Sequence, residues 1–174
     1  MLDWSNSFNK KGETSCESLG IYNLVGFERD GTDNLLGIKK AKCCDRDQTF
    51  WNTPTQCQMP DWVRSMDGTG TSNCQDGFFL RGLWRGDSNN VGSIEWGKCC
   101  KSSHHPYNWG GCYDEDVSNT FNKAGLSECK EAGHFIAGFQ TQDSGGKLSS
   151  IKKFKCCRMA DSEFLREVNS CSNV

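Results

Sequence analysis

The sequence contains the run Ile94-Glu95-Trp96-Gly97-Lys98-Cys99-Cys100, which ends in two adjacent cysteines. Runs of the same form occupy 38–44 and 151–157, each with an isoleucine five positions before its cysteine pair and a lysine directly before it. Upstream of each run stands a Gly-Phe or Gly-Leu dipeptide, and a single cysteine stands further upstream still. Independent residue types that recur at matched spacing predict three copies of one structural unit.

Single cysteines mark the rest of each unit. A middle cysteine precedes every pair, and in the second and third units an opening cysteine stands 17 residues before the middle one. The first unit has no opening cysteine, whereas Cys171 is left over, 14 residues after Cys157 and therefore near the spacing of an opening cysteine. We expect a single domain, 1–174, with repeats 1–44 (completed by 158–174), 45–100 and 101–157, closed into a ring by the C-terminal segment.

The 12 cysteines predict disulfides rather than a metal site, because their number is even and no Cys-x-x-Cys motif is present. Such bonds require an oxidising compartment, so we expect a secreted, extracellular chain. Adjacent residues of a strand point to opposite faces, so each pair favours two different partners. We expect the first member to bond the opening cysteine and the second the middle one: Cys57–Cys99, Cys74–Cys100, Cys112–Cys156, Cys129–Cys157, Cys16–Cys44 and Cys43–Cys171.

Each stretch between a middle cysteine and its pair predicts a β-hairpin. Clusters of Gly, Asn, Asp and Ser at 30–34, 86–90 and 143–146 separate apolar stretches, and these residue types tolerate turn conformations. The fold class is therefore mainly β: a disulfide-rich single domain of three pseudo-symmetric hairpin repeats, either trefoil-like or prism-like.

Charge and composition exclude several functions. The net charge of −2 gives no global attraction to nucleic acid, and no apolar run reaches the ~20 residues of a membrane span. No secretion signal is visible at Met1, so we take the chain as a mature protein or an excised domain. His104-His105 lacks metal-site spacing and is expected to be a surface pair. We expect no enzyme activity, no cofactor and no metal.

One family resemblance is visible in the third unit. The segment Phe121-Asn122-Lys123-Ala124-Gly125 precedes Cys129, and Ala137-Gly138-Phe139-Gln140-Thr141 precedes the cysteine pair and Arg158-Met159. These segments, together with the ending Cys171-Ser172-Asn173-Val174, resemble dermatopontin and its invertebrate relatives, although the Asp-Arg-x-Trp signature of that family is absent. The resemblance implies extracellular adhesion or a lectin activity.

Aromatic residues beside hydrogen-bonding side chains are the candidate ligand contacts. A sugar site combines an apolar face with a few placed polar groups. Trp4 and Trp62 occupy equivalent repeat positions and are expected in the core. The preferred platforms lie in the linkers and beside one hairpin turn: Trp51 with Asn52, Trp109 with Asn108, and Trp84.

Two further motifs suggest other partners. Arg85-Gly86-Asp87 falls at a predicted hairpin tip, where an integrin could bind the tripeptide. The basic runs at 39–42 and 152–155 suggest contact with a glycosaminoglycan or another anionic glycan. The leading hypothesis is a lectin-like, carbohydrate-binding domain. The alternatives are a matrix or cell-adhesion protein and the receptor-binding module of a pore-forming toxin.

Overall fold

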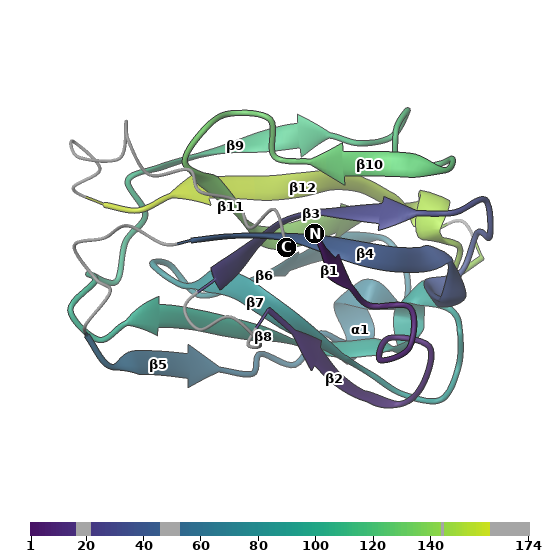
Figure 1. Ribbon diagram of the computed structural model, residues 1–174, viewed down its shortest axis with the longest axis horizontal. Helices are drawn as coiled ribbons and strands as arrows, with labels where there is room; N and C mark the ends of the chain where they lie inside the picture. Colours follow the sequence, from purple (N-terminus) through teal and green to yellow (C-terminus); the bar gives the residue numbers. More distant parts are fainter. Residues whose placement is uncertain (17–21, 46–52, 144, 161–174) are drawn as a thin grey trace.

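The computed structural model describes residues 1–16, 22–45, 53–143 and 145–160, and its strands form three antiparallel, four-stranded sheets (Figure 1). The mainly β, disulfide-rich fold class is thereby confirmed. In sheet order the strands are β1 (Leu2–Asp3), β4 (Ile38–Asp45), β3 (Tyr22–Arg29) and β10 (Gly125–Glu128) in sheet I; β2 (Gly12–Ser15), β7 (Phe79–Arg85), β8 (Ile94–Ser102) and β5 (Thr55–Gln58) in sheet II; β6 (Gly70–Asn73), β11 (His134–Thr141), β12 (Ile151–Arg158) and β9 (Gly111–Asp116) in sheet III.

The centre of each sheet is one predicted hairpin: β3–β4, β7–β8 or β11–β12. Each return strand begins at the repeated isoleucine of its run, a few residues later than the turn residues alone suggest. The return strand starts later because the three residues before each isoleucine form a 3-10 turn: η2 (Leu35–Gly37), η4 (Val91–Ser93) and η5 (Leu148–Ser150). Among the described residues the short helix α1 (Val63–Met66) is the one further helical element, and no helix there is long and apolar enough to cross a bilayer.

Each unit donates one strand to the sheet of the next unit. Strand β2 of the first unit pairs with β7 of the second, β6 of the second pairs with β11 of the third, and β10 of the third pairs with β3 of the first. Backbone hydrogen bonds between β10 and β3 therefore link the third unit back to the first. The C-terminal segment 161–174, which the sequence predicts to close the ring, lies outside the described residues.

The repeated glycine of each unit is explained by this exchange. Gly26, Gly82 and Gly138 face the donated strands, and a Cβ on any of them would lie only 2.5–2.6 Å from a backbone oxygen of the donated strand. Only glycine lets the two backbones approach so closely. The glycine is thus a requirement of the strand exchange.

The predicted disulfide pairing is wrong in its assignment within each cysteine pair. The second member bonds the opening cysteine and the first bonds the middle cysteine: Cys57–Cys100, Cys74–Cys99, Cys112–Cys157, Cys129–Cys156 and Cys16–Cys43. The expected bonds Cys57–Cys99, Cys74–Cys100, Cys112–Cys156, Cys129–Cys157, Cys16–Cys44 and Cys43–Cys171 are therefore not formed as such. Cys44 is itself disulfide-bonded, and Cys171 lies outside the described residues.

Strand register gives the reason for the correction. Cys57 on β5 stands directly opposite Cys100 on β8, with Cα atoms 4.1 Å apart, so these two side chains share one face of sheet II. The neighbouring Cys99 points to the opposite face, where it bonds Cys74, the middle cysteine of the unit. The principle of two partners on two faces is sound, but the direction of the faces is the reverse of the expected one.

The core lies between the three sheets and is rich in aromatic rings. Trp4 and Trp62 are each 2% exposed, as predicted, and Phe27 lies near Phe139 and Phe154 at centroid distances of 6.2 and 6.1 Å. The turn ends of the hairpins are joined across units by hydrogen bonds. The Leu35 N–H donates to the Asn89 carbonyl oxygen, and the Val91 N–H donates to the Gly146 carbonyl oxygen, both at 2.8 Å. The N–H and hydroxyl of Ser149 donate to the Asp33 carboxylate. The inner faces of the sheets are thus occupied by the core, and the outer faces remain accessible to solvent.

Candidate functional site

Two tryptophans pair across the outer face of sheet II. Trp84 on β7 stands opposite Trp96 on β8, with ring centroids 5.5 Å apart and ring planes inclined by 36°. Both side chains are half-buried, and neither belongs to the hydrophobic core. The pair therefore forms an apolar platform at the protein surface, which we call the tryptophan platform.

Charged groups border the tryptophan platform. The Lys11 Nζ lies 5.8 Å from the Trp84 ring centroid, and Glu13, opposite Trp84 on β2, forms an ion pair with Lys98 at 3.4 Å. On the far side, exposed Asp61 forms an isolated β-bridge with Trp96. An apolar surface edged by donors and acceptors suits a ligand that has both a C–H face and hydroxyl groups.

Trp109, the other candidate platform among the described residues, makes more contacts with its surroundings than Trp84 does. It is half-buried against the core, and its Nε1 donates a hydrogen bond to the Phe78 carbonyl oxygen at 2.8 Å. The Lys155 ammonium lies 4.5 Å from its ring centroid, a cation–π contact that covers one ring face. Asn108 is exposed, and its side-chain amide donates to the Trp109 carbonyl oxygen at 3.4 Å. The candidates Trp51 and Asn52 lie outside the described residues.

A groove of about 200 Å³ runs over the outer face of sheet III. It crosses all four strands of that sheet, and most of its side chains carry hydrogen-bonding groups: Thr71, Asn73, Asp114, Phe139, Gln140, Lys153 and Lys155. Since Lys155 also contacts Trp109, the predicted aromatic platform and the groove share one residue. We call this hollow the sheet III groove.

The two predicted basic runs differ in how their charges are balanced. On sheet I the lysines of 39–42 form ion pairs with carboxylates at 2.7–3.9 Å: Lys39–Asp30, Lys40–Glu28 and Lys42–Glu128. On sheet III, Lys153 and Lys155 have no carboxylate oxygen within 4 Å in the described part of the chain. Positive charge is therefore available at one of the two runs, rather than at both.

The Arg-Gly-Asp tripeptide is not displayed as the sequence suggests. Arg85 ends strand β7 and is 1% exposed, and its guanidinium donates hydrogen bonds to the carbonyl oxygens of Phe8, at 3.1 Å, and Ser88, at 2.8 Å. Asp87 is exposed. The arginine holds the hairpin turn to a neighbouring unit, so an integrin could reach only the carboxylate.

The histidine pair is also split by the structure. His104 is exposed, but His105 is 3% exposed, its Nε2 accepts a hydrogen bond from the Ala160 N–H, and its ring packs on Phe79. The prediction of a surface pair is therefore correct for His104 and wrong for His105, which is buried. No group of three or more His, Cys, Asp or Glu side chains is placed to hold a metal ion within the ranges described.

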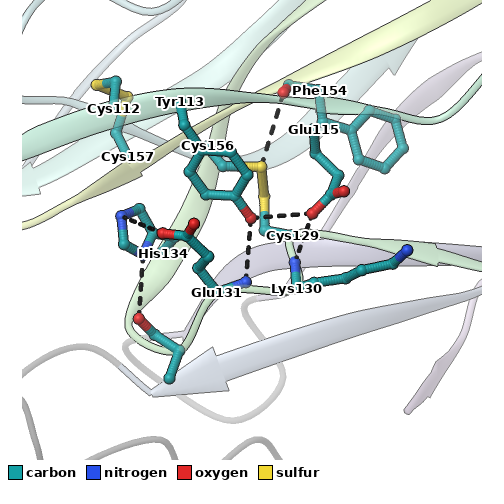
Figure 2. The surroundings of a disulfide bond; sticks show 11 residues. Cys112, Tyr113, Glu115, Cys129, Lys130, Glu131, His134, Phe154, Cys156 and Cys157 are labelled. Carbon is teal, nitrogen blue, oxygen red and sulfur yellow. Dashed lines mark hydrogen bonds and ion pairs between the residues drawn. A yellow bond between two sulfur atoms is a disulfide. The ribbon is translucent and has the colours of Figure 1, made fainter.

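A polar network surrounds the Cys129–Cys156 disulfide (Figure 2). The Tyr113 hydroxyl donates to Glu115 at 2.9 Å and accepts from the Glu131 N–H at 3.0 Å, while the Lys130 N–H donates to the same carboxylate at 2.9 Å. Burial, with a smaller contribution from Glu115, raises the pKa of Tyr113 to about 12. These bonds attach the loop after Cys129 to strand β9. Tyr113 and Glu115 alternate with the groove residue Asp114 along that strand, so the network lies on the other face of sheet III and is structural.

No family model, no curated protein and no solved structure matches this chain. Of the sequence candidates, Trp84 lies on the tryptophan platform, and Trp109 borders the sheet III groove through Lys155. Sequence reasoning missed Trp96 and Gln140 as site residues, although strand alternation places both on outer faces once the hairpin register is known.

Proposed function

We propose that this protein is a secreted, non-enzymatic, carbohydrate-binding domain that holds a sugar ring on the tryptophan platform. The observation that carries the proposal is the half-buried pair Trp84–Trp96 on an outer sheet face, outside the hydrophobic core. The C–H face of a sugar ring stacks on an aromatic surface, while its hydroxyl groups bond to polar side chains at the edge. Lys11, Glu13 and Asp61 supply that polar edge.

The disulfides support the location in this proposal. Five closed pairs tie the described strands together, and such bonds persist in oxidising, extracellular-type environments. Fixed sheets also hold the two indole rings in one arrangement before a ligand arrives, and preorganisation of this kind raises affinity.

Burial of Arg85 disfavours the adhesion alternative through Arg-Gly-Asp, since a buried guanidinium cannot contact a receptor without opening the hairpin turn. A cell-adhesion role through bound glycans remains compatible with the tryptophan platform.

The test is a glycan array, followed by titration calorimetry on the best ligand, with Trp84→Ala, Trp96→Ala and the double variant. We expect each single variant to lower affinity about tenfold or more, because buried Trp contacts carry much of a binding energy. Leu126→Ala is the matched control, since Leu126 is 41% exposed on β10 of sheet I, at the position equivalent to Glu13. An array without any glycan ligand, or a double variant with wild-type affinity and fold, contradicts the proposal.

A further inference from the structure

We propose that the sheet III groove binds the anionic group of a single acidic sugar residue, with Lys153 and Lys155 facing its carboxylate or sulfate. This inference rests on the proposed carbohydrate binding and adds a second subsite, chemically distinct from the tryptophan platform. The ligand class is a terminal acidic sugar, in contrast to a long sulfated polymer.

The three sheets carry different chemistry at one equivalent position. The cross-strand pair at this position is Glu28–Lys40 in sheet I, Trp84–Trp96 in sheet II and Gln140–Lys153 in sheet III. In sheet I the pair is closed by an ion pair at 3.9 Å, whereas in sheet III a neutral amide replaces the carboxylate. Lys153 forms no ion pair within 4 Å among the described residues, and the Asp116 carboxylate on β9 opposes it only at longer range. Two of the three faces are thus specialised for ligands, one apolar and one cationic.

The second lysine of the groove is held without loss of its charge. Lys155 is equivalent to Lys42 and Lys98, which are ion-paired with Glu128 at 2.7 Å and Glu13 at 3.4 Å. Lys155 instead lies over the Trp109 ring, and a π-face orients an ammonium group without neutralising it. Its charge therefore remains available to an anion that enters the groove.

The size of the groove and its uncharged residues suit one sugar ring. A volume of about 200 Å³ is below the ~300–1,000 Å³ of pockets for drug-sized ligands, so the groove accommodates a smaller unit. Thr71, Asn73 and Gln140 are exposed and supply hydroxyl and amide groups to the hydroxyls of the sugar.

Carboxylates on β9 limit the ligand to one anionic group. Asp114 stands opposite Lys155 and Asp116 opposite Lys153, at the rim of the same face. The Oδ1 atom of Asp116 accepts hydrogen bonds from the Ser118 N–H and hydroxyl at 2.9 and 2.6 Å, and these bonds, with a smaller contribution from the Lys153 charge, lower the pKa of this carboxyl. A chain with a charge on every sugar would meet these carboxylates, whereas a single charge between the two lysines would not.

The experiment is a chemical-shift titration of the ¹⁵N-labelled protein with three methyl glycosides: N-acetylneuraminic acid, galactose 6-sulfate and galactose. The first two separate carboxylate from sulfate recognition, and the third is the neutral reference. We expect at least one acidic glycoside to bind about tenfold more tightly than galactose and to shift the amides of β11 and β12, since a charge-assisted bond is the stronger kind.

Two substitutions separate the groove from general charge effects. Gln140→Glu rebuilds the Glu28–Lys40 arrangement of sheet I and is expected to abolish the preference for the acidic glycoside, as is Lys153→Gln. Lys40→Gln removes the same charge from the equivalent position of sheet I and is expected to leave the preference unchanged. Equal losses in Lys40→Gln and Lys153→Gln, or tighter binding of a heparin fragment than of either acidic glycoside, overturn the inference.

The outcome also distinguishes this inference from the proposed function. If galactose or another neutral glycan binds through Trp84 and Trp96 but acidic glycosides bind no better, only the inference about the groove fails. If no glycan of any kind binds, the proposed function and the inference fail together.

Discussion

Cys129 follows a strand of sheet I, yet its sulfur is bonded to Cys156 in sheet III, across a Cα–Cα distance of 5.8 Å. Cys74 and Cys99 join sheets III and II in the same way, and Cys16 and Cys43 join sheets II and I. Each middle cysteine therefore bonds back to its own unit from the sheet that received its strand. These three disulfides hold the ring of exchanged strands together.

This pattern predicts the partner of Cys44. In the second and third units the second member of the cysteine pair bonds the opening cysteine. By the same pattern Cys171 bonds Cys44, whereas the sequence alone predicts that Cys171 bonds Cys43. A Cys171→Ser variant should expose one free thiol, and alkylation followed by tandem mass spectrometry should locate that thiol at Cys44. Alkylation at Cys43 would instead restore the original assignment and contradict this pattern.

The disulfides should separate into two classes under mild reduction. Cys57 and Cys112 are exposed on the outer strands β5 and β9, whereas both sulfurs of Cys74–Cys99 and Cys129–Cys156 belong to residues at most 4% exposed. Thiol–disulfide exchange needs access for the attacking thiolate. With low dithiothreitol in native buffer, rapid alkylation should therefore label Cys57–Cys100 and Cys112–Cys157 first. Simultaneous labelling of all pairs would show that reduction follows global unfolding and would refute the two classes.

The sequence predicts the parts of the fold that spacing alone encodes. Three units, their hairpins and the buried positions of Trp4 and Trp62 follow from matched intervals between Cys, Gly, Ile and Trp. These features are local, or they repeat, so the three copies support one another as evidence.

The remaining features depend on contacts between units. Alternation shows that Cys99 and Cys100 face opposite ways, but which face meets Cys74 depends on the sheet that β6 joins. Counted from the turn, the pairing of Trp84 with Trp96 depends on a register shift between Trp84 and Arg85, because Arg85 pairs with Ile94. A bulge reverses the faces of all later residues, and no local signal places it.

Arg85 should act as a structural residue. Its buried side chain donates hydrogen bonds to four carbonyl oxygens and to the Asn89 side chain, and it lies over the Phe8 ring. Burial lowers the pKa of its guanidinium, and the Asp87 charge opposes that shift. Arg85→Lys keeps the charge but loses the forked geometry, so we expect it to lower the free energy of unfolding by about 2–4 kcal/mol.

The measurement is urea unfolding with intact disulfides. Arg64→Lys, at an exposed site on α1, is the control and should change stability by less than about 0.5 kcal/mol. Asp87→Glu should leave cell adhesion unchanged, because Arg85 is not displayed beside it. Wild-type stability of Arg85→Lys, together with loss of adhesion in Asp87→Glu, would show that the tripeptide acts as an integrin ligand after all.

Asp33 should make the junction between the first and third units sensitive to acid. Burial alone would raise the pKa of this carboxyl, but hydrogen bonds from the Ser149 hydroxyl and N–H, with the charge of Arg29, outweigh it and lower the pKa below its ordinary value. A carboxyl with a lowered folded pKa stabilises the fold above its unfolded pKa of about 3.9, and that stabilisation is lost as pH falls through the folded pKa.

Asp33→Asn should therefore reduce stability at pH 7 by about 1 kcal/mol, since the amide cannot accept from both Ser149 donors and lacks the charge that faces Arg29. In urea titrations the difference from the wild type should persist at pH 5, shrink below pH 4 and vanish once Asp33 is protonated. Asp87→Asn, at an exposed carboxyl, is the control and should show no such dependence. A difference between Asp33→Asn and the wild type that stays constant from pH 7 to pH 2 would mean that lost packing, rather than the ionised carboxylate, accounts for the effect.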